Sequence, residues 1–131
     1  MSARARVWVI VLHYRTWRET EDCVRSLLQS DYPRLRVLVV DNGSADGSTD
    51  ELCARLPAEV QFLTLPSNVY YAAGMNAGIA WVKQRDPSCS LLLVLNNDTL
   101  ADPGMLSQLV QASVQQPDAG IIAPVIYFAS Q

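Results

Sequence analysis

The sequence predicts an α/β domain built around a mostly parallel sheet. Apolar runs of strand length alternate along the chain with stretches of helical period. The chain has 131 residues, of which 50% are hydrophobic and 18% are charged. That length is typical of one domain, and that balance is typical of a folded protein rather than a disordered one. We therefore expect residues 1–131 to form a single domain.

The first strand is expected at residues 7–14, and a helix should follow it. Thr16 and Glu19 have the spacing of a capping box, in which two side chains satisfy backbone N–H groups at the start of a helix. The apolar residues that follow lie on one helical face, which predicts a helix to about Gln29. Tyr32-Pro33 comes just after this end. That face carries Trp17, Val24, Leu27 and Leu28.

A second strand and a short helix are expected next. Residues 36–40 are rich in β-branched side chains and apolar on both faces, as in a parallel strand that is covered on both sides. A turn at residues 41–43 closes this strand. Ser48 and Glu51 repeat the capping-box spacing, which predicts a helix to about Leu56.

A third strand is expected at residues 60–65, followed by a helix at residues 72–84 that contains two glycines. Gly74 and Gly78 each disfavour a helix by about 1 kcal/mol relative to alanine. Glycines in such places indicate that another group approaches the backbone closely. We favour a neighbouring strand or helix over a ligand as that group.

The most hydrophobic run, residues 91–95, is expected to form the fourth strand. Asp102 and Pro103 then predict a helix in which the aspartate caps the first turn and the proline opens it. A short last strand is expected at residues 120–125. The apolar residues of the last helix that should face inward are Leu106, Leu109, Val110 and Val114.

Composition and missing motifs exclude several functions. The net charge of -3 gives no general attraction to nucleic acid. No apolar run approaches the roughly 20 residues of a membrane helix, and the first six residues lack a secretory pattern, so we expect a cytoplasmic protein. The sequence lacks the glycine motifs of P-loop and dinucleotide-binding proteins and the serine elbow of hydrolases. Its three cysteines lack metal-ligand spacing.

Polar residues follow the strands where a ligand site is expected. In open parallel sheets, ligands bind beyond the carboxyl ends of the strands, near the point where the strand order reverses. For the order 3-2-1-4, this crevice lies between the first and fourth strands. The groups that collect there are His13-Tyr14-Arg15, Asp41-Asn42-Gly43, Asn68 and Asn96-Asn97-Asp98.

Two carboxylates on this edge have alternative interpretations. Asp98 offers oxygen ligands to a hard cation such as Mg²⁺ or Mn²⁺, or it belongs to a simple turn. Asp41 accepts hydrogen bonds from a nucleoside, or it bonds the backbone of its own loop. The residue types alone leave both alternatives open.

Three further side chains are weaker candidates. His13 is the only histidine, which excludes a multi-histidine metal site. We treat His13 as a binding candidate, although a hydrogen-bonded rim group is the commoner role for a lone polar residue at a strand end. Tyr70 and Tyr71 either stack on a base or sugar or pack within the protein.

Motifs with fixed spacing run through the whole chain, and their combination is more specific than any one of them. The first motifs are an apolar strand ending in His-Tyr-Arg (13–15), Ser-Leu (26–27) before Tyr-Pro (32–33), and Val-Asp-Asn-Gly-Ser (40–44) before Asp-Gly-Ser (46–48). The run from Asn68 to Gly78 matches most of the pattern Asn-x-Gly-Phe-Ala-x-Gly-x-Asn-x-Gly. Asn-Asn-Asp (96–98) is a variant of Asp-x-Asp, and Asp-Pro (102–103) follows it. In this combination the chain resembles the family 2 type glycosyltransferases of the GT-A fold, especially rhamnosyl- and galactofuranosyl-transferase-like members.

The resemblance implies a Rossmann-like GT-A fold and an inverting, metal-dependent glycosyltransferase. Such an enzyme transfers a sugar from a nucleoside-diphosphate-sugar donor, of UDP or dTDP type, to a hydroxyl of a glycan or lipid-linked acceptor. Asp98 would hold the metal, Mg²⁺ or Mn²⁺. The general base is expected beyond Gln131, so residues 1–131 would be the N-terminal, nucleotide-sugar-binding part of a longer catalytic domain. The alternatives are a truncated, non-catalytic nucleotide-sugar-binding module and a nucleotidyltransferase, whose glycine-rich loop is missing here.

The resemblance also implies which residues bind the donor. Asp41, Tyr14 and Asn76 would position the nucleoside. The expected location is cytoplasmic, either free or peripheral to the inner face of the membrane. A homodimer is also expected to be compatible with the chain, because an exposed apolar surface could pair with a second copy. The expected nucleotide-sugar-binding residues are His13, Tyr14, Arg15, Asp41, Gly43, Asn68, Gly74, Asn76 and Asn96.

The sequence departs from the family pattern at three positions. His13 and Arg15 stand where asparagines are usual. Tyr70 stands where the family has a glycine with a positive φ angle, a conformation that tyrosine adopts reluctantly. Donor choice or donor affinity is therefore expected to differ.

Overall fold

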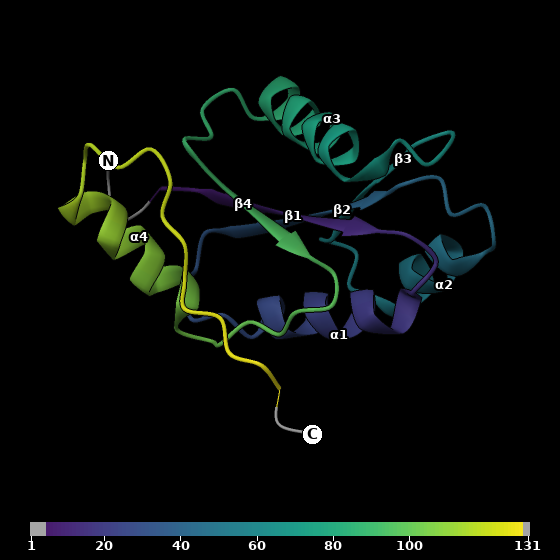
Figure 1. Cartoon of the computed structure of the whole chain (residues 1–131), viewed down its shortest axis with the longest axis horizontal. Helices are drawn as coiled ribbons and strands as arrows, with labels where there is room; N and C mark the ends of the chain where they lie inside the picture. Colours follow the sequence, from purple (N-terminus) through teal and green to yellow (C-terminus); the bar gives the residue numbers. More distant parts are fainter. Residues whose placement is uncertain (1–4, 130–131) are drawn as a thin grey trace.

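A four-stranded parallel sheet forms the centre of the protein, and helices cover both of its faces (Figure 1). The computed structural model describes residues 5–129. The strand order is β3-β2-β1-β4, which confirms the predicted order. Along the chain the elements are β1 (Val7–His13), α1 (Trp17–Leu28), β2 (Leu35–Asp41), α2 (Ser48–Arg55), β3 (Gln61–Thr64), α3 (Tyr70–Arg85), β4 (Leu91–Asn96) and α4 (Met105–Gln115).

Alternate residues of the strands feed two separate apolar cores, because successive side chains of a strand point to opposite faces. One core lies between the sheet and the helices α1, α2 and α4, and the other lies under α3. Figure 1 shows α3 on one side of the sheet and α1 and α2 on the other. The first core includes Val9, Val11, Leu27, Leu52 and Leu106, and the second includes Ile10, Leu38, Val40, Met75 and Val82.

Helix α3 lies unusually close to the sheet at its two glycines. A Cβ atom on Gly78 would sit 2.8 Å from Ile10 Cγ2 and 2.9 Å from Val40 Cγ2. A Cβ atom on Gly74 would sit 2.8 Å from Leu12 Cδ1. Both glycines are therefore explained by close packing against β1 and β2, which was the favoured interpretation.

The substitution Gly78→Ala tests this close approach. We expect it to lower the free energy of unfolding by about 1–3 kcal/mol in urea denaturation, because Ile10 and Val40 are β-branched and have few rotamers with which to make room. The control is Gly120→Ala, where an added Cβ meets nothing within 4 Å. Its expected effect is less than about 0.5 kcal/mol. Equal effects at the two sites would contradict the packing account.

Both predicted capping boxes are wrong, although both helices form. Thr16 is the N-cap of α1, yet its side chain makes no cap hydrogen bond. The N-cap of α2 is Gly47, with φ of 82°, and Ser48 is already inside the helix. The backbone N–H of Ser48 is instead bonded by Asp46 Oδ1 (3.0 Å). The threonine and serine hydroxyls are used elsewhere, in contacts across the fold that are described below.

The end of the chain also differs from the prediction. Helix α4 begins two residues after Pro103, and Asp102 Oδ1 accepts a hydrogen bond from the N–H of its N-cap, Gly104 (2.8 Å). Leu106 and Val110 are buried as expected, but Val114 is exposed. No strand forms at residues 120–125, where Ile121 and Val125 are exposed and have no sheet to join.

Two buried carboxylates tie elements together in different parts of the fold. Glu21 of α1 pairs with Arg25 Nη2 and with Arg55 Nε of α2, both at 2.8 Å, and the hydrogen bond from Arg55 is the largest cause of its lowered pKa. Asp86 follows α3 and pairs with Arg6 Nη1 at 2.8 Å, which holds the pKa of Asp86 well below its usual range. These ion pairs fix α2 against α1 and the end of α3 against the start of β1.

Strand β4 forms one edge of the sheet and is the least covered strand on the α3 side. Its neighbour is β1, and its outward-facing Leu92 and Val94 are 37% and 45% exposed. By contrast, the residues of β1 on the same face are buried or nearly so. Within residues 5–129, no helix is long and apolar enough to cross a membrane.

Candidate functional site

The carboxyl ends of β1, β2 and β4 meet at one edge of the sheet. In the register of the sheet, His13 lies opposite Asp41, and Leu12 lies opposite Asn96. The loops that follow these strands therefore start side by side, with β1 in the middle. The polar segments predicted to form the site do begin at a common edge.

Asp41 organises the loop after β2. The residue is 2% exposed, and its Oδ1 accepts a hydrogen bond from the backbone N–H of Ser44 (2.9 Å). Ser44 Oγ in turn accepts a hydrogen bond from the N–H of Arg15 (2.9 Å), which links the loops after β1 and β2. The interpretation that Asp41 bonds the backbone of its own loop is thus confirmed. The role of Asp41 toward a nucleoside stays a prediction.

Gly43 is required where the loop after β2 touches the loop before α3. Its φ is +72°, and a Cβ atom there would lie 2.3 Å from the backbone carbon of Ser67. No other residue fits both the conformation and the space. The contact brings the segment that starts α3 against the Asp41 loop.

Asn42 completes this contact and was given no role by the sequence. It is buried, its Oδ1 accepts a hydrogen bond from Val69 N (3.0 Å), and its Nδ2 donates to Asn68 Oδ1 (3.1 Å) and to Tyr70 O (3.2 Å). Asn68 Oδ1 also accepts from Tyr70 N (2.8 Å). Asn42 and Asn68 together hold the start of α3. The signal available in the sequence was the position of Asn42 inside the Asp-Asn-Gly-Ser motif.

Tyr70 has the strained backbone that was expected of it. Its φ is +65°, and its side chain is 82% exposed, so no packing compensates the strain. The next residue, Tyr71, is also exposed. Neither ring is packed in the core, which leaves both available at this edge.

Replacing Tyr70 with glycine is expected to stabilise the protein by about 1 kcal/mol, because glycine adopts positive φ without the steric cost. The matched control is Tyr71→Gly inside the same helix, which should destabilise by about 1 kcal/mol through lost helix propensity. Both values are measured by thermal or urea denaturation. A destabilising effect at position 70 would show that the ring makes contacts worth more than the strain.

His13 is fully buried beneath the edge. Its Nδ1 lies 2.8 Å from Thr20 Oγ1 of α1, and its Nε2 lies 3.0 Å from Ser48 Oγ of α2. Burial lowers the pKa of the imidazole, and the charges of Asp41 and Asp46 oppose that shift. The side chain therefore joins β1 to two helices in the neutral state, and its ring has no face open to a ligand in this structure.

Stability is expected to fall as the pH is lowered through His13's titration. Its folded pKa lies below the ordinary value of 6.5. In the unfolded chain the imidazole has its ordinary pKa. At a pH between the folded and the unfolded pKa, the unfolded chain therefore binds the proton more readily, and stability declines with falling pH by at most about 1.4 kcal/mol per pH unit. Urea denaturation of the wild type and of His13→Asn between about pH 5 and pH 8 checks this dependence. An equal slope in the variant would remove His13 as its source.

The Asn-Asn-Asp segment combines a turn with a free carboxylate. Asn97 Nδ2 donates to Thr16 Oγ1 (2.8 Å) and to Thr20 Oγ1 (3.1 Å), while Asn96 O accepts from Thr99 Oγ1 (2.7 Å). Asp98 is exposed and makes no hydrogen bond or ion pair within residues 5–129. The turn is therefore real, and it presents a carboxylate whose oxygens are uncommitted.

A divalent cation at Asp98 would need oxygen ligands from elsewhere. Within the described residues, no group of three or more His, Cys, Asp or Glu side chains could hold a metal ion. A single exposed carboxylate next to amide groups fits a hard cation when phosphate oxygens complete its ligand shell. The residues present are compatible with a metal that binds together with a diphosphate.

The other predicted residues have mixed surroundings. Tyr14 is at the border of exposure, and the guanidinium of Arg15 lies 4.9 Å from its ring centroid. Arg15 has φ of 63°, a conformation that asparagine tolerates better. Gly74 is buried against Leu12 and Asn42, whereas Asn76 is exposed on α3. Arg15 thus supplies a positive charge at the edge, and Gly74 serves packing.

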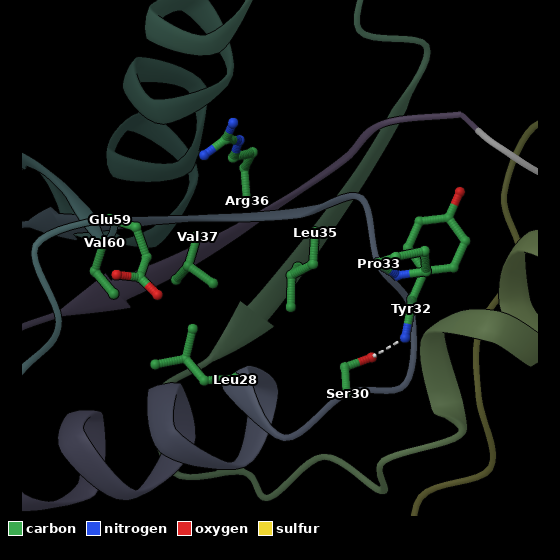
Figure 2. Close-up of a pocket in the computed structure, with 9 residues that line it drawn as sticks. All are labelled: Leu28, Ser30, Tyr32, Pro33, Leu35, Arg36, Val37, Glu59 and Val60. Atoms are coloured by element: carbon green, nitrogen blue, oxygen red, sulfur yellow. Dashed lines mark hydrogen bonds between the residues drawn. The ribbon is translucent and has the colours of Figure 1, made fainter.

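A shallow pocket lies at the opposite end of β2 and contains none of the predicted site residues. Figure 2 shows its lining around the start of β2, where the N–H of Tyr32 donates to Ser30 Oγ (3.2 Å). The lining residues are Leu28, Ser30, Tyr32, Pro33, Leu35, Arg36, Val37, Glu59 and Val60. The pocket has no charged cluster that would recognise a diphosphate.

The fold and the edge can be compared with known proteins. A family model described as "Glycosyl transferase family 2" matches residues 8–131. The chain belongs to glycosyl transferase family 2. Within this family it is 27% identical over 124 residues to the N-acetylglucosaminyl-diphospho-decaprenol L-rhamnosyltransferase of Mycobacterium tuberculosis, across 90% of the chain and 40% of that protein. It is 26% identical to glycosyltransferase GlyG of Streptococcus pneumoniae, across 87% of the chain and 36% of that protein.

Solved structures show the same fold. Mannosyltransferase PcManGT from Pyrobaculum calidifontis, in complex with GDP-Man and Mn²⁺, has a TM-score of 0.67 at 21% identity, over 82% of this chain and 32% of its own. TarS of S. aureus, in complex with UDP-GlcNAc, has a TM-score of 0.70 at 18% identity, over 86% of this chain and 32% of its own. This family 2 chain has the GT-A fold and spans about two fifths or less of the length of these proteins.

Proposed function

We propose that the chain binds a nucleoside-diphosphate sugar and supplies the donor-binding part of an inverting glycosyltransferase. The observation that carries the proposal is the common edge where β1 stands between the Asp41 loop and the Asp98 turn. Membership of family 2 supports sugar transfer as the reaction class. Neighbouring folds bind UDP, UDP-GlcNAc or GDP-Man, which supports a nucleotide-sugar donor here.

The residues of the edge would divide the work between the two ends of the donor. The nucleoside would be positioned by Asp41, Tyr14 and Asn76. The cationic Arg15 would lie near the negative charge of the donor. Asp98 would hold Mg²⁺ or Mn²⁺, and the cation would supply positive charge to stabilise a departing diphosphate. The acceptor hydroxyl, of a glycan or a lipid-linked sugar, would attack the anomeric carbon with inversion. Its proton would go to a general base that the residues of this edge do not supply.

The proposal predicts metal-dependent binding of a nucleotide sugar. UDP-, dTDP- and GDP-sugars are titrated calorimetrically into the chain with and without Mn²⁺, with UDP or dTDP sugars expected to bind. Asp98→Asn should weaken binding in the presence of Mn²⁺ by at least about tenfold, equivalent to about 1.4 kcal/mol. The control is Asp118→Asn, which removes another exposed carboxylate, after α4, and should leave affinity unchanged.

Two results would count against this function. Binding that is equally tight without metal, or that survives Asp98→Asn unchanged, would remove Asp98 as the metal ligand. Failure of every nucleotide sugar to bind would remove the donor site altogether.

Slow metal-dependent hydrolysis of the bound donor would distinguish a catalytic domain from a non-catalytic nucleotide-sugar-binding module.

A further inference from the structure

A continuous path of hydrogen bonds, buried except for its part-buried last link, runs beneath the candidate site. It starts at Ser48 at the beginning of α2, passes through His13 at the end of β1 and reaches Thr20 of α1. From Thr20 it continues to Asn97, the residue immediately before Asp98. The path therefore joins the segment that follows the Asp41 loop to the turn that carries Asp98.

Thr20 is the branch point of this path, and its single proton decides the direction of the bonds. Its Oγ1 lies 3.1 Å from Thr16 O, which only accepts, and 3.1 Å from Asn97 Nδ2, which only donates. All three contacts are satisfied when Thr20 donates to Thr16 O and accepts from Asn97 and from His13 Nδ1. The imidazole then carries its proton on Nδ1, and its Nε2 lies 3.0 Å from Ser48 Oγ.

Asn97 is held by both of its amide protons. One is donated to Thr16 Oγ1 at 2.8 Å and the other to Thr20 Oγ1 at 3.1 Å. On the far side of Asp98, Thr99 Oγ1 donates to Asn96 O at 2.7 Å. Asp98 itself makes no hydrogen bond or ion pair with the rest of the described chain. Its position is therefore set by the two residues that flank it.

We propose that Thr20 is a positioning residue for the metal-binding carboxylate: its hydroxyl, aligned by His13, fixes Asn97 and so orients Asp98. The inference rests on the proposed function, because Asp98 must bind the cation for its orientation to matter. Residues that orient a metal ligand typically change metal affinity when they are removed, by about 10–100-fold. Thr20 is fully buried, and its hydroxyl bonds Asn97 rather than Asp98.

The test compares two substitutions of Thr20. Thr20→Val keeps the shape and removes the hydroxyl, whereas Thr20→Ser keeps the hydroxyl. Mn²⁺ is titrated in the presence of UDP, and free Mn²⁺ is followed by its electron paramagnetic resonance signal. We expect Thr20→Val to weaken Mn²⁺ binding roughly tenfold and Thr20→Ser to restore it to within about twofold of the wild type.

A second threonine provides a matched control. Thr49 of α2 has a buried hydroxyl with no hydrogen-bond partner among the described residues, so Thr49→Val makes the same chemical change without breaking the path. It should leave Mn²⁺ affinity unchanged. In nitrogen-15 NMR spectra without metal, the side-chain amide signals of Asn97 should move in Thr20→Val and stay in place in Thr49→Val.

The outcomes separate the inference from the function on which it rests. If the wild type binds Mn²⁺ with UDP and Thr20→Val binds it equally well, the positioning role is overturned and the function stands. If the wild type shows no metal-dependent binding with UDP, dTDP or GDP, the function falls and the positioning role falls with it. If Thr20→Val does not fold, Asn97→Ala decides, because it breaks the same link at a half-buried residue and should weaken Mn²⁺ binding equally.

Discussion

The parallel pairing of β1 with both of its neighbours is the constraint on which the rest of the structure depends. Because β1 is bonded to β2 on one side and to β4 on the other, all three strands end at the same edge. The chain must leave each strand there, and each exit carries polar groups rather than apolar ones. The candidate site is a result of topology first and of individual side chains second.

The fold could be predicted from the sequence because its apolar patterns are strong. Strands with β-branched residues on both faces, separated by helical stretches, leave few arrangements other than a parallel sheet covered on both sides. The close approach at Gly74 could also be predicted, since it depends on a backbone property of one residue type. Local chemistry was sufficient for these features, whereas the positive φ at Tyr70 was expected only from the glycine that the resembling family has at that position.

Features that depend on distant partners could not be predicted. Thr16 and Ser48 have the right spacing for capping boxes, but the hydroxyl of Thr16 meets Asn97 and that of Ser48 meets His13. Nothing in a capping motif reveals that a residue 81 positions away competes for the same hydroxyl. Likewise, the apolar residues 120–125 suit a strand, yet a strand forms only where another strand can bond to it.

The two edges of the sheet have different consequences for the behaviour of the protein in concentrated solution. Strand β3 is only four residues long, so it offers a short row of backbone groups to another chain. Strand β4 has six residues, with Leu92 and Val94 partly open to water beside a backbone row to which no other strand of residues 5–129 bonds. Self-association through intermolecular strand pairing should therefore begin at β4. A lysine in place of Val94 would improve solubility without disturbing the buried cores.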